Sequence, residues 1–446
     1  MTARPCSPVI SIVLALAVIA VDVGVWAQQT ALQTIKPQQR DLVEGMLKNI
    51  HEALKRNYYD SSFHGLDVDA RYKEYDQRIK KAETLGDAFR VVAAYLSGLN
   101  DSHTFFVPPR RNNIADYGYQ MQMVGDACYV TEVRPGSDAE QRVHPGDQII
   151  SLDGYAVGRT DLWQLDYYLN QIAPKPMTGM TVRSPSGEMR KVVIATKYTK
   201  RDEHSVMAGP MDTDFWSQKL EHEGQQHLLH QRFVEKGDVL FWKMPAFVVE
   251  GSEVSRMIGL ARKHKTLILD LRGNPGGYVT TLSLLVGSVM DHDVAITTRV
   301  TRKGQKQEIA KSRGDNLFTG NLIVLVDSRS ASAAELFARV VQLEHRGTVV
   351  GDRSSGSVME SIYYPFDDYS GVVVFYGASI THADLIMADG KSLEKVGVTP
   401  DVLLLPSAVQ LAAGEDPALA KAAQLGGLNL DAVEAGKLFP FEWATQ

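Results

Sequence analysis

Residues 321–344 read NLIVLVDSRSASAAELFARVVQLE, in which an apolar run passes directly into an amphipathic pattern. The run Leu322–Val326 has the length and branching of a strand buried on both faces, and it ends at the polar turn 327–330. Apolar residues then recur at the i, i+3, i+4, i+7 and i+8 spacing of a buried helix face, namely Ala333, Leu336, Phe337, Val340 and Val341. The stretch therefore predicts a strand, a tight turn and a helix, with Ser332 in the first turn of the helix.

Ser332 has two interpretations. A hydroxyl on a strand-to-helix turn is exposed at the carboxyl end of a sheet, beside free backbone N–H groups that can bind an oxyanion, so the residue is a candidate nucleophile. The sequence Ser332-Ala-Ala-Glu335 also fits a capping box, in which the serine caps the helix and Glu335 returns the hydrogen bond. Serines at helix starts are more often caps than nucleophiles, so this stretch alone leaves both interpretations open.

Composition bounds the class of protein. With 446 residues, the chain is too long for one ordinary core and predicts two or three domains. The net charge is −6 and no long basic block occurs, which argues against a nucleic-acid surface.

Residues 1–27 have the pattern of an export signal. Arg4 supplies a weak positive region, Val9–Val21 an apolar stretch, and Val25-Trp26-Ala27 precedes a cut after Ala27. We therefore expect export to a periplasm or secretion, with no stable membrane insertion after cleavage. An uncleaved anchor is the alternative, although the apolar run is short for a bilayer. Cleavage would leave Cys128 alone, which excludes an intrachain disulfide framework.

A helical pattern follows the signal. Residues 28–112 keep helical spacing of apolar residues over much of their length, and Gly98 marks the end of the last helix. The polar loop Asn100–Thr104 then places Ser102 and His103 side by side, between apolar anchors. A single loop histidine is more often structural or solvated than catalytic, so the pair alone decides nothing.

Residues 113–200 change to short strands separated by Pro-Gly and Asp-Gly turns, with one helix among them. The segments Val133-Arg-Pro-Gly-Ser-Asp-Ala139 and Pro145-Gly-Asp-Gln-Ile-Ile-Ser-Leu-Asp-Gly154 resemble the inter-strand signature of a PDZ domain. This resemblance implies that an extended peptide end can add to a sheet edge beside the helix. The candidate peptide-binding loop consists of Tyr117, Gly118 and Tyr119.

Residues 201–236 are polar, charged and poorly patterned, which predicts a linker or insertion. His222-Glu223 and His227 look like part of a zinc-protease helix, but that motif needs histidines four residues apart and these are five apart. His227 and His230 can share a helix face, yet no carboxylate or cysteine has ligand spacing. The sequence therefore predicts no metal site.

Strands and helices alternate in residues 237–446, which predicts a parallel sheet with right-handed crossovers and a C-terminal helical tail. The glycine-rich loop Asp270-Leu-Arg-Gly-Asn-Pro-Gly-Gly277 is expected at the carboxyl ends of the strands, where sites form. Glycines allow close backbone approach, so Gly276 or Gly277 can supply one oxyanion donor and Ala333 the other. No Gly-Lys-Ser/Thr or GxGxxG pattern follows the loop, so we expect neither a phosphate site nor a cofactor.

Three stretches together resemble a known peptidase family. They are Asp270–Gly277, Ser330-Ala-Ser-Ala-Ala-Glu335 and Gly397-Val-Thr-Pro-Asp401. With the PDZ-like segment, they look like the carboxy-terminal processing proteases and the tricorn protease core, over roughly residues 38–425. The resemblance implies an α/β fold, with a crotonase-like (ClpP/crotonase) core, an inserted PDZ domain and an N-terminal helical region. It also implies that Ser332 is the nucleophile.

The general base differs between branches of this family. The processing branch has a lysine after the next strand, where this chain has Ser357, and no lysine occurs from residue 312 to residue 390. The tricorn-like branch uses an adjacent Ser-His pair and a late glutamate, and Ser102, His103 and Glu394 fit these positions. The resemblance thus implies that His103 is the base and that the other two residues orient it.

Two functions of different class follow. The first is an exported serine endopeptidase that cleaves extended polypeptides through an acyl-enzyme, with Ser332 as nucleophile and His103 as general base. The second is a catalytically silent binding or scaffold protein whose PDZ domain captures peptide ends, which the missing lysine favours. The expected partners are polypeptide substrates or peptide C-termini, and not nucleic acid.

Overall fold

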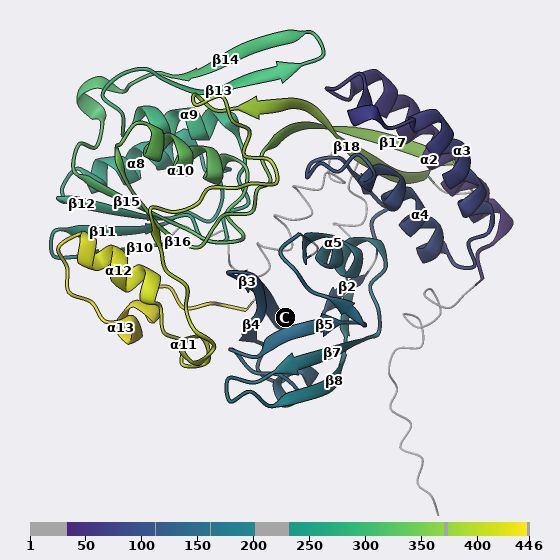
Figure 1. Ribbon diagram of the computed structural model, residues 1–446, viewed down its shortest axis with the longest axis horizontal. Helices are drawn as coiled ribbons and strands as arrows, with labels where there is room; N and C mark the ends of the chain where they lie inside the picture. The colour runs from purple at the N-terminus through teal and green to yellow at the C-terminus, as the bar shows by residue number, and fades with distance from the viewer. Residues whose placement is uncertain (1–33, 112, 161, 201–231, 370–372, 444–446) are drawn as a thin grey trace, which may run out of the picture.

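The computed structural model describes most of the chain. The described ranges are 34–111, 113–160, 162–200, 232–369 and 373–443. The predicted signal peptide, most of the predicted linker and the histidines at 222, 227 and 230 lie outside the described residues. Figure 1 shows a sheet wrapped by helices, a second sheet under the N-terminal helices, and a small β-rich domain between them.

The sheet of the C-terminal part has the order β10-β11-β12-β15-β16-β19. Its strands are β10 (Arg232–Lys236), β11 (Val239–Lys243), β12 (Thr266–Asp270), β15 (Asn321–Val326), β16 (Gly347–Gly351) and β19 (Val402–Leu403). From β11 to β19 all neighbours are parallel, which confirms the prediction from alternating strands and helices. The carboxyl ends of β12 and β15 therefore meet at one edge of the sheet, where the site lies.

Helices cover both faces of this sheet (Figure 1). One face packs against α8 (Gly251–Ala261), α9 (Val279–Gly287) and α10 (Ala333–Leu343), and the other against α12 (Pro417–Leu425) and α13 (Ala432–Gly436). Along β15, Leu322, Val324 and Val326 lie in the first core, whereas Ile323 and Leu325 lie in the second. The prediction of a strand buried on both faces is confirmed, because its apolar run supplies both cores.

The prediction of a linker over residues 201–236 is wrong for the last part of that range. Arg232–Lys236 form β10, which pairs antiparallel with β11 at the edge of the sheet. Phe233, Glu235 and Lys236 are exposed on this strand, because an edge strand is covered only in part. Because this segment is rich in charged residues, its sequence did not predict the strand.

A second sheet is built around one long strand, β18 (Val373–Ile386), whereas the apolar run Val372–Phe375 alone predicts only a short strand there. β18 pairs with β1 (Phe105–Val107), β13 (Val294–Thr301) and β17 (Met359–Tyr369), and β14 (Gly304–Ala310) pairs with β13. The helices α2 (Pro37–Asn57), α3 (Val68–Lys80) and α4 (Leu85–Ser97) share a core with this sheet. The prediction of N-terminal helices is confirmed, but β1 also ties that region to the second sheet.

The small domain is a sheet of order β3-β4-β5-β7-β8. Its strands are β3 (Tyr119–Val124), β4 (Ala127–Val133), β5 (Gln148–Leu152), β7 (Met177–Arg183) and β8 (Met189–Ala195), with β6 (Tyr155–Ala156) beside β5 and the helix α5 (Leu162–Tyr167). β2 (Asn113–Asp116) pairs with β9 (Lys197–Lys200), so the two ends of the domain lie together.

Candidate active site

Ser332 lies between β15 and α10, and its backbone is strained. Its φ of 53° and ψ of −117° fall in a region that residues with a Cβ rarely adopt. The Ser332 N–H donates to the Ser357 carbonyl at 2.9 Å and to Glu335 Oε2 at 3.0 Å. The predicted bond from Glu335 back to the helix start is therefore present, and the turn has the geometry that exposes a nucleophile.

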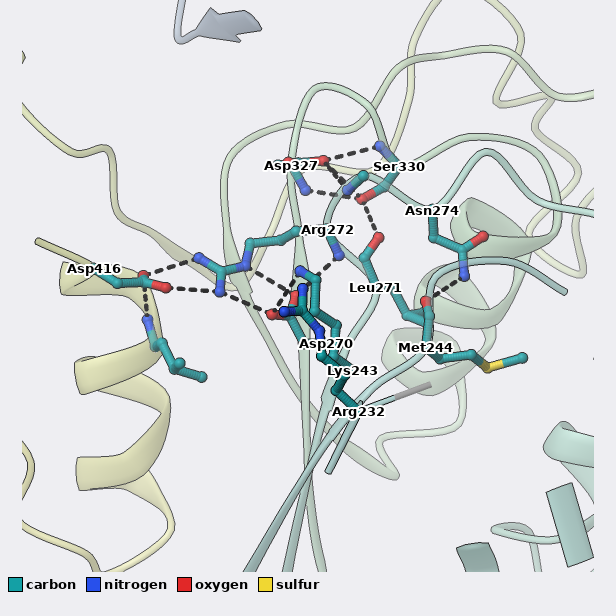
Figure 2. Close-up of polar contacts among 12 residues, drawn as sticks. Arg232, Lys243, Met244, Asp270, Leu271, Arg272, Asn274, Asp327, Ser330 and Asp416 are labelled. Carbon is teal, nitrogen blue, oxygen red and sulfur yellow. Dashed lines mark hydrogen bonds and ion pairs between the residues drawn. The ribbon is translucent and has the colours of Figure 1, made fainter. Parts of the chain in front are cut away.

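The turn before Ser332 is tied to the glycine-rich loop (Figure 2). Asp327 Oδ1 accepts N–H bonds from Gly273, Arg329 and Ser330 at 2.9 to 3.0 Å. Ser330 Oγ donates to the Leu271 carbonyl at 2.8 Å. The two loops at the carboxyl ends of β12 and β15 are thus fixed to each other by Asp327 and Ser330.

An ion-pair cluster supports the glycine-rich loop from below (Figure 2). The Arg272 guanidinium donates to Asp270 at 2.8 and 2.9 Å and to Asp416 at 2.7 and 2.9 Å. Burial raises the pKa of Asp270, but the charges of Arg272 and Lys243 outweigh it and hold that pKa below its usual range. Because both Asp270 oxygens are bonded, the buried charge is compensated and fixes where the loop starts.

The glycines of this loop lie against Ser332, the candidate nucleophile. A Cβ on Gly276 would lie 2.6 Å from Ser332 Cβ and 2.9 Å from the Ala331 carbonyl, and the φ of Gly276 is 97°. The Gly276 N–H, however, donates to Asn274 Oδ1 at 2.9 Å, so Gly276 is wrong as an oxyanion donor. Within the described part of the chain, the N–H groups of Gly277 and Ala333 carry no hydrogen bond and remain as the two candidate donors.

We expect Gly276→Ala to lower kcat/KM by about 100-fold or more, because the new methyl group must displace the Ser332 turn and its oxyanion donors. Gly273→Ala is the matched control. Gly273 also has a positive φ, of 73°, but a Cβ there meets nothing within 4 Å, so it costs only backbone strain of about 1 kcal/mol. Peptide cleavage and thermal unfolding of both variants measure this, and equal activities would contradict it.

Ser102, His103 and Glu394 form one hydrogen-bonded group. Ser102 Oγ lies 2.7 Å from His103 Nδ1 and donates to Glu394 Oε2 at 2.8 Å. The Ser102 N–H donates to Glu394 Oε1 at 2.8 Å. The sequence resemblance placed these three side chains together, and the structure brings them together across 292 positions.

The hydrogen bonds assign a tautomer to His103. Ser102 Oγ carries a single hydrogen, and the Glu394 carboxylate takes it. His103 Nδ1 must then be the donor in its bond to Ser102 Oγ. This leaves the lone pair on Nε2, which is the form that a general base requires.

A short segment joins this group to the nucleophile. Ser332 donates its N–H to the Ser357 carbonyl, and the next residue, Val358, donates its N–H to Glu394 Oε2 at 2.9 Å. Ser332 and His103, 229 positions apart in the sequence, thus belong to one hydrogen-bonded set. The Ser357 side chain, at the position of the family lysine, contacts Ser355 Oγ at 3.0 Å.

Two carboxylates hold this hydrogen-bonded set in place. The sequence predicted no catalytic role for either of them. Asp101 is buried and accepts from the N–H groups of His103 and Thr104, from Thr381 Oγ1 and from Tyr58 Oη, at 2.7 to 2.9 Å. The sequence contained a signal for this role, because Asp101 begins the segment Asp-Ser-His-Thr, which has the pattern of an Asx turn. Asp101 therefore sets the backbone that carries His103.

Glu335 is the second carboxylate, and its side chain is completely buried. Besides Ser332, it accepts from Ser354 Oγ at 2.5 Å and from the N–H groups of Gly356 and Ser357 at 2.7 and 3.0 Å. Burial raises its pKa to about 7, although these hydrogen bonds oppose the rise. The glutamate of the predicted capping box thus also anchors residues 354–357.

We expect Glu335 to stabilise the fold more at low pH. Its folded pKa of about 7 exceeds the ordinary 4.5, so its contribution is fully present below about pH 4.5 and is lost as the pH rises through 7. A difference of about 2.5 between the two pKa values corresponds to roughly 3 kcal/mol. Denaturant unfolding of the wild type and of Glu335→Gln at about pH 4.5 and about pH 8 isolates it, since the other carboxylates cancel. Parallel pH dependence of the two proteins would contradict this.

The candidate peptide-binding residues lie at the start of β3. Tyr117 and Tyr119 belong to the core of the small domain, and Tyr117 Oη donates to the Leu169 carbonyl at 2.8 Å. Gly118 has a φ of 73° and packs against Ser137. The tyrosine side chains are thus structural, and the Gly118 backbone is already bonded within the domain, its N–H to Asp116 Oδ1 at 2.9 Å and its carbonyl to the Arg134 N–H at 2.8 Å.

The free edge of β3 touches the nucleophile turn. The carbonyl of Met123 accepts from Ser328 Oγ at 2.6 Å, and the carbonyl of Met121 accepts from the Arg329 guanidinium. Ser328 and Arg329 precede Ser332 by only a few residues. The small domain and the site are therefore in direct contact.

The described ranges contain no cluster of three or more histidine, cysteine or acidic side chains that could hold a metal ion. No helix in the same ranges combines the length and the apolar character needed to span a membrane.

Known protein domains match two parts of the chain. Residues 238–404 match peptidase family S41, and residues 40–97 match the tricorn protease C1 domain. The first range contains the glycine-rich loop, Ser332 and Glu394, and the second contains most of the N-terminal helices. Both ranges therefore match domains of known peptidases.

Two curated proteins are similar to most of this chain. The chain is 25% identical to the tail-specific protease of Haemophilus influenzae over 359 residues, which cover 74% of this chain and 48% of that protein. It is 21% identical to the chloroplastic carboxyl-terminal-processing peptidase 1 of Arabidopsis thaliana, over 82% of this chain and 72% of that protein. The chain is thus similar to the carboxy-terminal processing proteases, but spans about half the length of the first relative.

Solved structures share the fold. Mature CPAF superposes with a TM-score of 0.64 at 15% identity, over 84% of this chain and 94% of that chain. The photosystem II D1 C-terminal processing protease gives a TM-score of 0.51 at 20% identity, over 91% and 100%. At such identities the likeness concerns the fold alone.

Proposed function

We propose that this chain is a serine endopeptidase that cleaves extended polypeptides through an acyl-enzyme. The observation that carries the proposal is the continuous hydrogen-bonded set from Ser332 through Ser357, Val358 and Glu394 to Ser102 and His103. It combines a strained turn at Ser332, a histidine with its lone pair on Nε2, and the N–H groups of Gly277 and Ala333, which carry no hydrogen bond within the described ranges.

In this mechanism, His103 Nε2 takes the proton as Ser332 Oγ attacks the peptide carbonyl. The oxyanion is bound by the N–H groups of Gly277 and Ala333. His103 then gives its proton to the leaving amine, and the acyl-enzyme remains on Ser332. Water activated by the same histidine hydrolyses that ester. Ser102 and Glu394 hold the imidazole in the required tautomer throughout, and His103 serves as the base that a lysine supplies in the processing branch.

We further propose that the core is crotonase-like and that the small domain is an inserted PDZ domain that binds polypeptide ends. Its strand order, its helix α5 and the adjacent strands β2 and β9 support this. Because the Met121 and Met123 carbonyls already bind the nucleophile turn, the binding position lies at the start of β3, beside Gly118. If so, deleting residues 113–200 lowers cleavage of long polypeptides more than that of short peptides.

Labelling with a fluorophosphonate probe tests the proposal. Wild-type protein should be labelled and Ser332→Ala should not, with the modified residue identified by mass spectrometry. Absence of label on folded wild-type protein would favour the silent binding protein instead. N-terminal sequencing of exported material tests the proposed signal, since cleavage after Ala27 gives a chain that starts at Gln28.

A further inference from the structure

The last described segment, 437–443, leaves the core and crosses to the small domain (Figure 1). It is first fixed to the core. Phe439 packs against the apolar core under α12 and α13, and Arg232 of β10 donates to the Pro440 carbonyl at 2.6 Å. Beyond α13 the segment has no regular secondary structure, so these contacts set its direction.

The far end of the segment rests on the small domain. The guanidinium carbon of Arg134 lies 4.4 Å from the centre of the Trp443 ring. Phe441 packs edge-on against Trp443, with ring centres 4.9 Å apart. The Arg134 side chain is 13% exposed, so this contact is partly buried, and an apolar side chain of another ligand can take the place of the indole on the arginine.

Arg134 lies next to the candidate peptide-binding loop. It follows β4, and its N–H donates to the Gly118 carbonyl at 2.8 Å. Its guanidinium also lies 3.0 Å from Asp116, at the end of β2. Trp443 therefore covers the residue that stands beside Gly118, at the start of β3.

We propose that residues 439–443 occupy the peptide-binding position of the small domain in cis, so that a polypeptide end must displace Trp443 from Arg134 before it binds. The inference rests on the peptide-binding role proposed above. It names the occupant of that position, an aromatic segment of the same chain, and the kind of ligand that fits it, a peptide end with an apolar side chain that can take the place of the indole.

The test measures binding of a fluorescent peptide with an apolar carboxyl-terminal residue. The full chain carries Ser332→Ala, so the peptide is not cleaved, and anisotropy gives its Kd. Trp443→Ala should lower the Kd about twofold to fivefold, which is the equivalent of losing a competing contact of about 0.5–1 kcal/mol. Arg134→Ala should raise the Kd, because it removes the position that both ligands share.

Phe233→Ala is the matched control. Phe233 also stacks near an arginine, Arg256 at 5.5 Å, but it lies on β10 of the core, away from the small domain. This variant should leave the Kd unchanged. A Trp443→Ala protein that binds the peptide no more tightly than Phe233→Ala, or no binding by any variant, overturns the inference.

The peptidase proposal is read out separately. Fluorophosphonate labelling and cleavage of a short peptide by protein with Ser332 intact report on the site without the small domain. Tighter binding by Trp443→Ala together with an unlabelled Ser332 would leave the inference standing and remove the peptidase. Labelling of Ser332 without any change in Kd would do the reverse.

Discussion

Ser332→Ala is expected to lower peptide cleavage by about 10⁴-fold or more, because no acyl-enzyme can form without the hydroxyl. The turn should survive, since its contacts to Ser357 and Glu335 use the backbone N–H. The measurement is kcat/KM on a fluorogenic peptide, with circular dichroism and thermal unfolding to confirm the fold.

Ser357→Ala is the control for this prediction. Ser357 is also a serine, lies one hydrogen bond from Ser332 and stands where the processing branch has its lysine, but its side chain reaches only Ser355. Its replacement should change kcat/KM by no more than a few-fold. If Ser357→Ala were as damaging as Ser332→Ala, the missing lysine would have been replaced by a serine hydroxyl, and the proposed base would be wrong.

His103→Ala should lower kcat by about 10²- to 10⁴-fold, since an unassisted hydroxyl is a poor nucleophile near neutral pH. Burial raises the pKa of Glu394, so it becomes protonated at a higher pH than an exposed glutamate does. Neutral Glu394 holds Ser102 less well, and protonated His103 cannot act as a base. Cleavage should therefore rise with pH as Glu394 becomes ionised, at a higher pH than an exposed glutamate does.

His345→Ala and His382→Ala are the comparisons for His103→Ala. His345 is exposed at the end of α10, and His382 lies on β18. Both should cleave like the wild type. Wild-type cleavage by a folded His103→Ala protein would instead exclude the tricorn-like relay, and a loss in one of the other two would identify the base.

Local pattern was enough to predict the strand, turn and helix around Ser332. The apolar run of β15 and the helical spacing of α10 are encoded within a few residues of each other, and so is the glycine-rich loop at the end of β12. Motif resemblance supplied the partners, Ser102, His103 and Glu394. Nothing in the residues themselves brings Ser332 and His103 together, because 229 positions of intervening fold do that.

The elements that escaped prediction depend on tertiary context. β18 reads Val-Val-Phe-Tyr-Gly-Ala-Ser-Ile-Thr-His-Ala-Asp-Leu-Ile from Val373 to Ile386, where small and polar residues break the apolar pattern. Thr381 is buried there only because Asp101 and Thr104 arrive from another part of the chain. The hydrogen bond from the Gly276 N–H could not be predicted either, because it depends on the orientation of the Asn274 side chain.

The positive φ of Ser332 has a consequence for how the sequence can change. A glycine at this position would relax the backbone, so selection for stability alone favours the loss of the nucleophile. The backbone conformation at position 332 thus favours glycine, yet the chain has a serine there. In a homologue under no selection for peptide cleavage, Ser332→Gly would therefore increase the stability of the fold. A glycine at this position in a related sequence would indicate that the protein has lost its catalytic activity.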